Sequence, residues 1–185
     1  SSHGLDQNRI SGLPINIAAI TNITNDHLDY HGSFNSYKNT KLKLFTKYLE
    51  KNGKAIINSY IQLPKGFKKY LKNKSISVIT YGKPNSEIYI KHRSEKISIK
   101  IFNKFYRLPS NFRDKFNIQN FECAITILIC LGIKKEIILK NLIYLFDPPG
   151  RMEKCTHIHN NSKVYIDFAH TPDALQNALM SLNSI

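Results

Sequence analysis

The fold is decided by residues 14–33, which read PINIAAITNITNDHLDYHGS and pass from an apolar run into a polar block. Ile15–Ile23 is rich in apolar and β-branched residues, which predicts a buried strand. The turn His31-Gly32 follows, and Ser33 is a suitable N-cap for a helix over about Phe34–Glu50, with Gly53 just past its end. This order of strand, loop and helix predicts a layered α/β protein.

The rest of the chain continues the alternation of strands and helices. Alternating apolar and polar residues over Glu87–Leu108, with a tight turn at Asn103-Lys104, predict a small antiparallel meander with one solvated face. The other expected elements are strands at Ala55–Asn58, Ile76–Tyr81 and Val164–Phe168, and helices at Asn117–Leu131, Lys134–Leu145 and from Thr171-Pro172 onward.

The clearest boundary signal is Asp147-Pro148-Pro149-Gly150, because two prolines and a glycine stop a helix and stiffen a connector. We therefore expect one domain over residues 1–150 and the start of a second over residues 151–185. The second piece is too small to bury a core by itself. Residue 1 is not Met, and we expect the sequence to begin inside a longer chain and both domains to be truncated.

Composition excludes several classes of protein. A hydrophobic content of 42% disfavours disorder, and the longest apolar run, Cys123–Ile133, is far shorter than the roughly 20 residues that span a bilayer. We therefore expect no membrane insertion. With Cys155, the chain has three cysteines, which is an odd number, and it has no Cys-x-x-Cys spacing. Both features favour reduced thiols and a cytoplasmic location.

The formal net charge is +14, from 27 Lys and Arg against 13 Asp and Glu. Such a charge is compatible with a nucleic-acid-binding module. The lysines, however, are scattered from Lys38 to Lys163, whereas a docking surface needs its charges on one face. The dispersal favours a protein without a nucleic-acid partner, and the basic binding module stays as the alternative from a different class.

The block Asp26–His31 contains two carboxylates and two imidazoles directly after the first strand. Ligands of open α/β sheets bind beyond the carboxyl ends of strands, so this place suits a site. A polar loop with internal hydrogen bonds explains the composition equally well. As metal ligands the residues are ambiguous, because imidazole favours transition metals while carboxylates also suit Mg²⁺.

Lys41 falls on the apolar stripe of the expected helix, four residues after Tyr37 and four before Phe45. One interpretation is a side chain whose methylenes pack while its ammonium reaches water. The other is a desolvated amine with a lowered pKa, which reacts with carbonyl groups or CO₂. Periodicity alone favours the first.

Several further polar residues could contribute to a site. Asn117 and Asn120 share one face at the start of an apolar helix, where a polar ligand could bind, although Asn117 could be only an N-cap. Arg151, Asp167 and His170 lie near the expected domain boundary. In the same apolar helix, Cys123 and Cys130 are expected to pack in the core.

Taken together, these segments resemble the Mur ligases in order and spacing. The matching segments are SSHGLDQNR at 1–9, TN at 21–22 with DHLDYHG at 26–32, Lys41, FNIQN at 116–120, GRME at 150–153 and DFAHTPDAL at 167–175. Within this family the opening and the DHLDYH block are most similar to the tripeptide synthetases that act on UDP-MurNAc-L-Ala-D-Glu.

The resemblance implies a partial Mur ligase central domain, with a mostly parallel sheet, flanking helices and a small antiparallel sheet. The first strand and helix of a Rossmann-like C-terminal domain would follow. It also implies an ATP- and Mg²⁺-dependent amide ligase of peptidoglycan precursor synthesis. The D-glutamate carboxylate of UDP-MurNAc-L-Ala-D-Glu would be phosphorylated, and a diamino acid, in this family more commonly meso-diaminopimelate than lysine, would attack the acyl phosphate. The expected protein is monomeric.

The resemblance also assigns roles to individual residues. His27 matches a Mg²⁺ ligand, and Lys41 matches a lysine that family members carbamylate into a further oxygen ligand. The positions that hold the UDP-MurNAc dipeptide correspond to Ser1, Gln7 and Arg9. The positions that hold ATP correspond to Asn117, Asn120, Arg151, Asp167 and His170.

Three family features are missing from the sequence as it stands. The phosphate loop Gly-x-x-Gly-Lys-Thr and a metal-binding glutamate would precede Ser1, and the block Asp-Asn-Pro-Arg that selects the amino acid would follow Ile185. We therefore expect residues 1–185 alone to be inactive. A nonfunctional or split-gene remnant of such a ligase is the main alternative.

Overall fold

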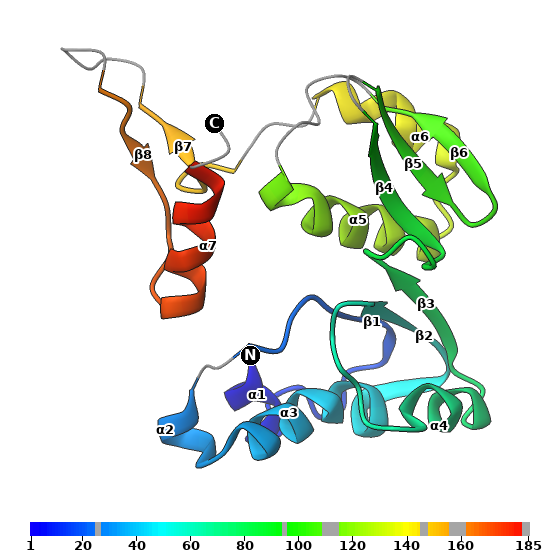
Figure 1. Ribbon diagram of the computed structural model, residues 1–185. Helices are drawn as coiled ribbons and strands as arrows, with labels where there is room; N and C mark the ends of the chain where they lie inside the picture. Colours follow the sequence, from blue (N-terminus) through cyan, green and yellow to red (C-terminus); the bar gives the residue numbers. More distant parts are fainter. Residues whose placement is uncertain (25–26, 94–95, 109–114, 145–147, 156–161, 183–185) are drawn as a thin grey trace.

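The structure, a computed structural model, describes residues 1–24, 27–93, 96–108, 115–144, 148–155 and 162–182, with only the backbone at 93, 115–117 and 173. One six-stranded sheet has the strand order β1-β2-β3-β4-β5-β6 (Figure 1). Its strands are β1 (Ile15–Ile20), β2 (Leu49–Asn58), β3 (Ser77–Tyr81), β4 (Ile88–Arg93), β5 (Lys96–Ile101) and β6 (Lys104–Arg107). The predicted α/β class is confirmed.

The expected meander is present but is not a separate sheet. Strands β4, β5 and β6 pair antiparallel, as predicted, with a turn at Phe102 and Asn103. β4 also pairs in parallel with β3, through the single register position Tyr81↔Ile88. The meander therefore extends the parallel sheet β1–β3, and that junction could not be read from alternation within the meander alone.

Helices cover both faces of β1–β3, because successive side chains of a strand point to opposite faces. Ala55 and Ile57 of β2 pack in one core with α3 (Phe34–Lys43), the π-helix η1 (Leu44–Tyr48) and α4 (Phe67–Asn73). Ile56, between them, belongs to a second core with α5 (Lys115–Cys130), α6 (Lys135–Asn141) and the 3₁₀ helix η2 (Leu142–Tyr144). This second core also holds the inward side chains of β4 and β5.

The helix expected over Phe34–Glu50 is shorter than predicted. α3 ends at Lys43, η1 follows, and β2 begins at Leu49, well before the strand expected at Ala55–Asn58. Gly53 therefore lies within β2, where the pairing with β1 shifts between Ile15↔Leu49 and Ile17↔Lys54. A Cβ at Gly53 would lie 2.8 Å from the Glu50 carbonyl oxygen, so the close backbone approach explains this glycine.

Other boundaries differ by a few residues. β1 ends at Ile20 rather than Ile23, and β3 begins at Ser77. α5 ends at Cys130, and the predicted stop at Gly132 is confirmed by its φ of 85°. The helix expected over Lys134–Leu145 is α6 followed by η2, and residue 145 lies outside the described residues.

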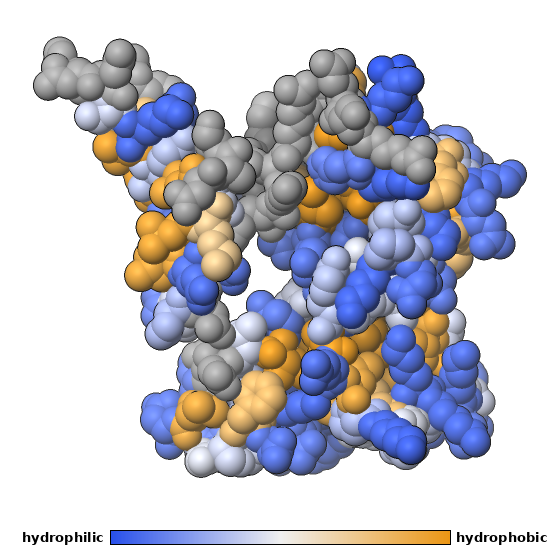
Figure 2. Space-filling view, viewed as in Figure 1, coloured by the Kyte–Doolittle hydropathy of each residue, from blue (hydrophilic) through white to orange (hydrophobic). Residues whose placement is uncertain are grey.

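The C-terminal part forms a two-stranded antiparallel sheet and one helix: β7 (Glu153–Lys154), β8 (Tyr165–Ile166) and α7 (Pro172–Leu182). The predicted helix start is confirmed, because the Thr171 hydroxyl accepts a hydrogen bond from the Ala174 amide at 3.2 Å. β8 is shorter than the predicted Val164–Phe168, and β7 was not predicted. Apolar side chains of this part, including Phe168, Leu175 and Leu179, are exposed (Figure 2).

Two short helices were not predicted at all. α1 (Ser2–Asp6) opens the chain, and α2 (Leu28–His31) occupies the polar block after β1. Both lie beside α3, at the lower left of Figure 1. Among the described helices, none is both long and apolar enough to cross a membrane.

Candidate functional site

Of the polar residues around α1, one caps the helix and two follow it with exposed side chains. Ser1 is the N-cap of the helix, since its Oγ accepts a hydrogen bond from the Gly4 amide at 3.1 Å. Gln7 and Arg9 follow the helix with exposed side chains. All three residues predicted to hold a UDP-sugar peptide are therefore exposed, and the hydroxyl of Ser1 is also engaged in capping.

His27 stands directly before α2 in the left-handed region, with φ of 51°, and its side chain is exposed. Its ring meets that of His3 edge-on, with 4.6 Å between centroids. The His3 ring also contacts Tyr30 at 4.2 Å and lies 5.7 Å from His31. We call these four residues, His3, His27, Tyr30 and His31, the aromatic cluster. It joins α1 to the polar block that the sequence singled out.

Lys41 lies half-buried on α3, between the buried residues Tyr37 and Phe45 of its stripe. Its Nζ donates a hydrogen bond to the Asn22 carbonyl oxygen at 3.1 Å and sits 4.8 Å from the centroid of the Tyr37 ring. A carbonyl acceptor and an aromatic face both favour the charged ammonium. The placement thus combines packed methylenes with a solvated charge, while the predicted carbamylation stays a prediction.

A pocket of about 360 Å³ opens beyond the carboxyl ends of β1 and β2, where open α/β sheets bind ligands. Its wall includes Asn22, the backbone partner of Lys41, together with Lys38 and Gln119. Lys41 therefore lies next to this pocket and is linked to it through the chain that follows β1.

Buried Asn58 ties the ends of the strands to α5. Its Nδ2 donates to the Thr21 carbonyl oxygen at 2.7 Å and to Gln119 Oε1 at 2.8 Å, while its Oδ1 accepts from the Tyr60 amide at 3.0 Å. This fixes the start of α5 relative to the strand ends. Asn117 lies in the first turn of α5, but its side chain is outside the part of the chain that the structure describes.

A second pocket, of about 320 Å³, lies between α5 and the C-terminal part. It brings together four residues that the sequence predicted for one ligand, Asn120, Arg151, Asp167 and His170. The Arg151 guanidinium lies over the Phe168 ring, 5.0 Å from its centroid, and His170 meets the same ring edge-on. A cation, an imidazole, an amide and an aromatic plane suit a phosphate-bearing heteroaromatic ligand.

Asp167 shapes the wall of this second pocket. Its two carboxylate oxygens accept hydrogen bonds from the Met152 amide at 2.9 Å and the Ala169 amide at 2.8 Å. The carboxylate thereby holds the turn after Arg151 against the chain after β8. Ser1, Gln7 and Arg9 line neither of the two pockets, so the structure separates the residues predicted for the two substrates.

The donor set offers only part of a magnesium site. Among the described residues, no group of three or more His, Cys, Asp or Glu side chains is placed to hold a metal ion. Lys41 would contribute only after losing its positive charge, because an ammonium repels a cation. His27 and Lys41 therefore do not complete a magnesium site with the described residues.

Sequence reasoning missed Glu122, which is 1% exposed on α5. Its Oε1 accepts a hydrogen bond from the Ile90 amide of β4 at 2.5 Å, and its Oε2 is buried without a partner among the described residues. Desolvation raises the pKa of this carboxyl to about 7. The sequence signal that could have revealed Glu122 is a single acidic residue within an otherwise apolar helix. The expected core positions of Cys123 and Cys130 are confirmed, and Cys155 is also a free thiol.

Residues 1–128 match the family model described as the Mur ligase middle domain. The 2,6-diaminopimelate ligase of Rickettsia montanensis is 35% identical over all of this chain, which covers 39% of that protein. UDP-N-acetylmuramyl-tripeptide synthetase 2 of Oceanobacillus iheyensis is 32% identical over 98% of the chain, which covers 38% of it. The chain thus spans well under half the length of these relatives.

Solved structures agree with these relatives. A UDP-N-acetylmuramoyl-L-alanyl-D-glutamate–2,6-diaminopimelate ligase superposes with a TM-score of 0.76 at 27% identity, covering 99% of this chain and 38% of that one. The MurF ligase of Thermotoga maritima in complex with ADP shares the fold, with a TM-score of 0.69 at 16% identity over 97% of this chain and 41% of that one. From its motifs, its fold and the match over residues 1–128, this chain belongs to the Mur ligase family.

Proposed function

We propose that the chain belongs to an ATP-dependent amide ligase of peptidoglycan precursor synthesis, which joins a diamino acid to UDP-MurNAc-L-Ala-D-Glu. The family membership and the ligases that match the chain over its whole length support this proposal. Diaminopimelate is the proposed diamino acid, since the first relatives are named for it. The proposed domains are residues 1–150 and 151–185.

The observation that carries the proposal is the pocket between α5 and the C-terminal part. Asn120, Arg151, Asp167 and His170 come from separate segments and meet there, as a single nucleotide would require. We propose that Arg151 contacts phosphate oxygens and that Asn120 and His170 contact the base and ribose, while Asp167 holds the turn that presents Arg151. The related fold that binds ADP supports a nucleotide here.

The proposed reaction has two steps. A carboxylate oxygen of the D-glutamyl group attacks the γ-phosphorus of ATP, and ADP leaves; the amine then attacks the acyl carbon, and inorganic phosphate leaves as the amide bond forms. Residues of this chain would screen the negative charges and hold the reactants in line. Gln7 and Arg9 would hold the UDP-sugar peptide. His27 and a carbamylated Lys41 would belong to the Mg²⁺ site, which supplies further screening.

Nucleotide binding to residues 1–185 tests the second pocket. We expect ADP to bind and Arg151→Ala to raise its dissociation constant about tenfold, the usual effect of removing a charge-assisted hydrogen bond. Arg107→Ala, which removes an exposed arginine of β6, should leave binding unchanged. Equal affinities for the two variants would contradict the assignment.

In an assay for tripeptide formation, we expect no product from residues 1–185 alone; ATP-dependent product would refute that expectation.

The sequence of the flanking DNA separates an intact ligase from a remnant. An in-frame Gly-x-x-Gly-Lys-Thr upstream and Asp-Asn-Pro-Arg downstream would support the ligase. Interruption of either reading frame would support the remnant.

A further inference from the structure

α2 is held by neighbours rather than by its own structure. It contains four residues, Leu28–His31, none of which is buried, and a helix of this length is not stable alone. His27 precedes it in the left-handed region, which costs free energy for a residue with a side chain. The place of the His27 ring therefore depends on whatever fixes α2.

Tyr30 is the residue of α2 with the most specific contacts. Its hydroxyl donates to Asp6 Oδ2 at 3.3 Å and accepts from Gln7 Nε2 at 3.4 Å. Its ring lies against His3, whose ring also lies near those of His27 and His31. Tyr30, which is 42% exposed, thus has its hydroxyl hydrogen-bonded to the segment around α1.

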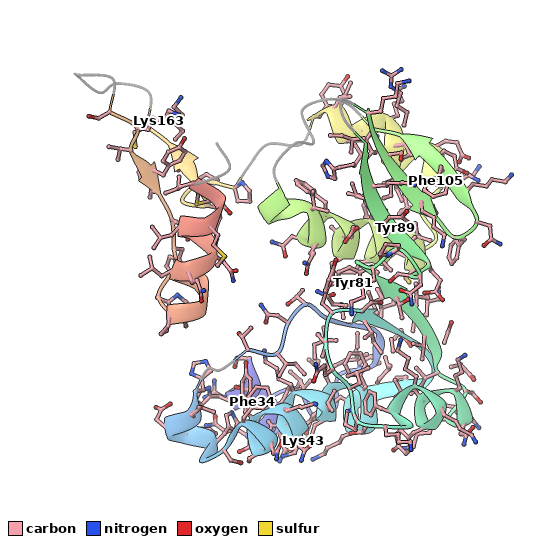
Figure 3. All side chains as sticks on the ribbon, viewed as in Figure 1. Phe34, Lys43, Tyr81, Tyr89, Phe105 and Lys163 are labelled. Atoms are coloured by element: carbon pink, nitrogen blue, oxygen red, sulfur yellow. The ribbon has the colours of Figure 1, made fainter. Side chains whose placement is uncertain are left out.

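Asp6 connects this contact to the body of the molecule. Its Oδ1 accepts a hydrogen bond from Lys43 Nζ at 2.8 Å, and Lys43 lies on α3, beneath α1 in Figure 3. The hydrogen bond from Lys43, with a smaller contribution from Tyr30, holds the pKa of Asp6 below its ordinary value. α1 is fixed further by the Tyr48 hydroxyl, which donates to the Leu5 carbonyl oxygen at 3.0 Å. The Asp6 carboxylate therefore links Tyr30 to α3 through Lys43.

We propose that Tyr30 is a positioning residue that couples the segment carrying Gln7 and Arg9 to the ring of His27. The connection runs from Lys43 through Asp6 to the Tyr30 hydroxyl, and from the Tyr30 ring through His3 to His27. Gln7 belongs to the same set of hydrogen bonds. Binding of a UDP-sugar peptide to Gln7 and Arg9 would thus change the contacts that position His27. This coupling rests on the proposed function; the link from Tyr30 to His27 does not.

Tyr30→Phe removes the hydroxyl and keeps the ring. We expect the ring signals of His27 to shift and broaden in NMR spectra of residues 1–185 with labelled histidine, because α2 loses its bonds to Asp6 and Gln7. Tyr70→Phe is the matched control, since Tyr70 is 41% exposed on α4, away from the aromatic cluster. Amide signals of β1–β3 should match wild type in both variants. Unchanged His27 signals in Tyr30→Phe would overturn the proposal.

Titration with UDP-MurNAc-L-Ala-D-Glu separates the coupling from the proposed function. In the wild-type chain we expect shifts in residues 1–9 and in the His27 ring together. Tyr30→Phe should lose the His27 response and bind about three- to tenfold more weakly, because the hydroxyl that accepts a hydrogen bond from Gln7 is gone. Binding that moves residues 1–9 but not His27 in the wild-type chain would overturn the coupling. Absence of binding to the wild-type chain would contradict the substrate assignment, and the coupling with it.

Discussion

Lys41 contacts the Asn22 carbonyl oxygen and the Tyr37 ring, and both contacts favour the charged ammonium. Because CO₂ reacts with the neutral amine, the ammonium has to lose its proton before Lys41 is carbamylated. We nevertheless expect a carbamate on its Nζ in ¹³C-bicarbonate, because Lys41 matches the lysine that the Mur ligases carbamylate. A carbamate carbonyl signal in ¹³C NMR would disappear in Lys41→Ala and persist in Lys38→Ala, the cation one turn earlier. A signal insensitive to Lys41→Ala would refute the modification.

Glu122 should make stability depend on pH. Desolvation raises its pKa from 4.5 to about 7, so the folded state binds this proton more tightly than the unfolded state. The contribution of Glu122 to the free energy of unfolding is therefore fully present below its unfolded pKa of 4.5 and is lost as pH rises through about 7. The loss is about 3 kcal/mol at most. Urea midpoints at pH 4 and pH 8 measure the difference.

In Glu122→Gln we expect the urea midpoint to change much less over the same range, because glutamine keeps an acceptor for the Ile90 amide and does not titrate. Glu50→Gln, at an exposed position of β2, should retain the wild-type slope. The same slope in Glu122→Gln and wild type would show that another group is responsible.

At the scale of elements, Gly53 sets the pairing of β1 with β2. Alanine there would bring its Cβ within 2.8 Å of the Glu50 carbonyl oxygen and 3.0 Å of the Asn16 carbonyl oxygen. Since both contacts are backbone, we expect Gly53→Ala to cost about 1–3 kcal/mol in the free energy of unfolding. Gly4→Ala, where the nearest atom is the Ser1 hydroxyl oxygen at 3.5 Å, should change it by less than about 0.5 kcal/mol. Comparable losses would argue against this role of Gly53.

Elements with a strong pattern were predictable, and elements fixed by distant contacts were not. The apolar run of β1, the apolar α5 and the Thr171-Pro172 start of α7 carry local signals that the structure confirms. The shifted pairing of β2 with β1, where Gly53 approaches the backbone closely, depends instead on a contact between separate segments. The periodicity within one segment cannot predict such a contact, because the contact joins two segments that are far apart in the sequence.

The candidate site likewise contains residues that could be predicted from the sequence and contacts that could not. The resemblance to the Mur ligases pointed to Asn120, Arg151, Asp167 and His170, and the structure brings them to one pocket. The contacts of Tyr30 with Asp6 and Gln7 escaped prediction, because a polar pair 24 residues apart leaves no pattern in the chain. The roles of all these residues stay predictions until ligands are tested.

At the scale of the whole molecule, the C-terminal part adds little to the core. Neither hydrophobic core contains a described residue beyond Leu142, and Ala178 is the one buried apolar residue described after Gly150. A chain ending at Gly150 should therefore keep its free energy of unfolding within about 1 kcal/mol. Ile138→Ala, in the core, should cost about 2–5 kcal/mol. A larger loss on truncation than in Ile138→Ala would show that α7 contributes more than its burial indicates.

The single register position between β3 and β4 has a consequence for local stability. β2 pairs with β1 and with β3 at five positions each, whereas β3 and β4 share the one register position Tyr81↔Ile88. We therefore expect the two halves of the sheet to open separately, as two cooperative units that both pack on α5. Amide hydrogens of β5 and β6 should exchange with deuterium in one kinetic group and those of β2 in a slower one. Exchange of all strands at one rate would instead indicate that α5 makes the sheet a single cooperative unit.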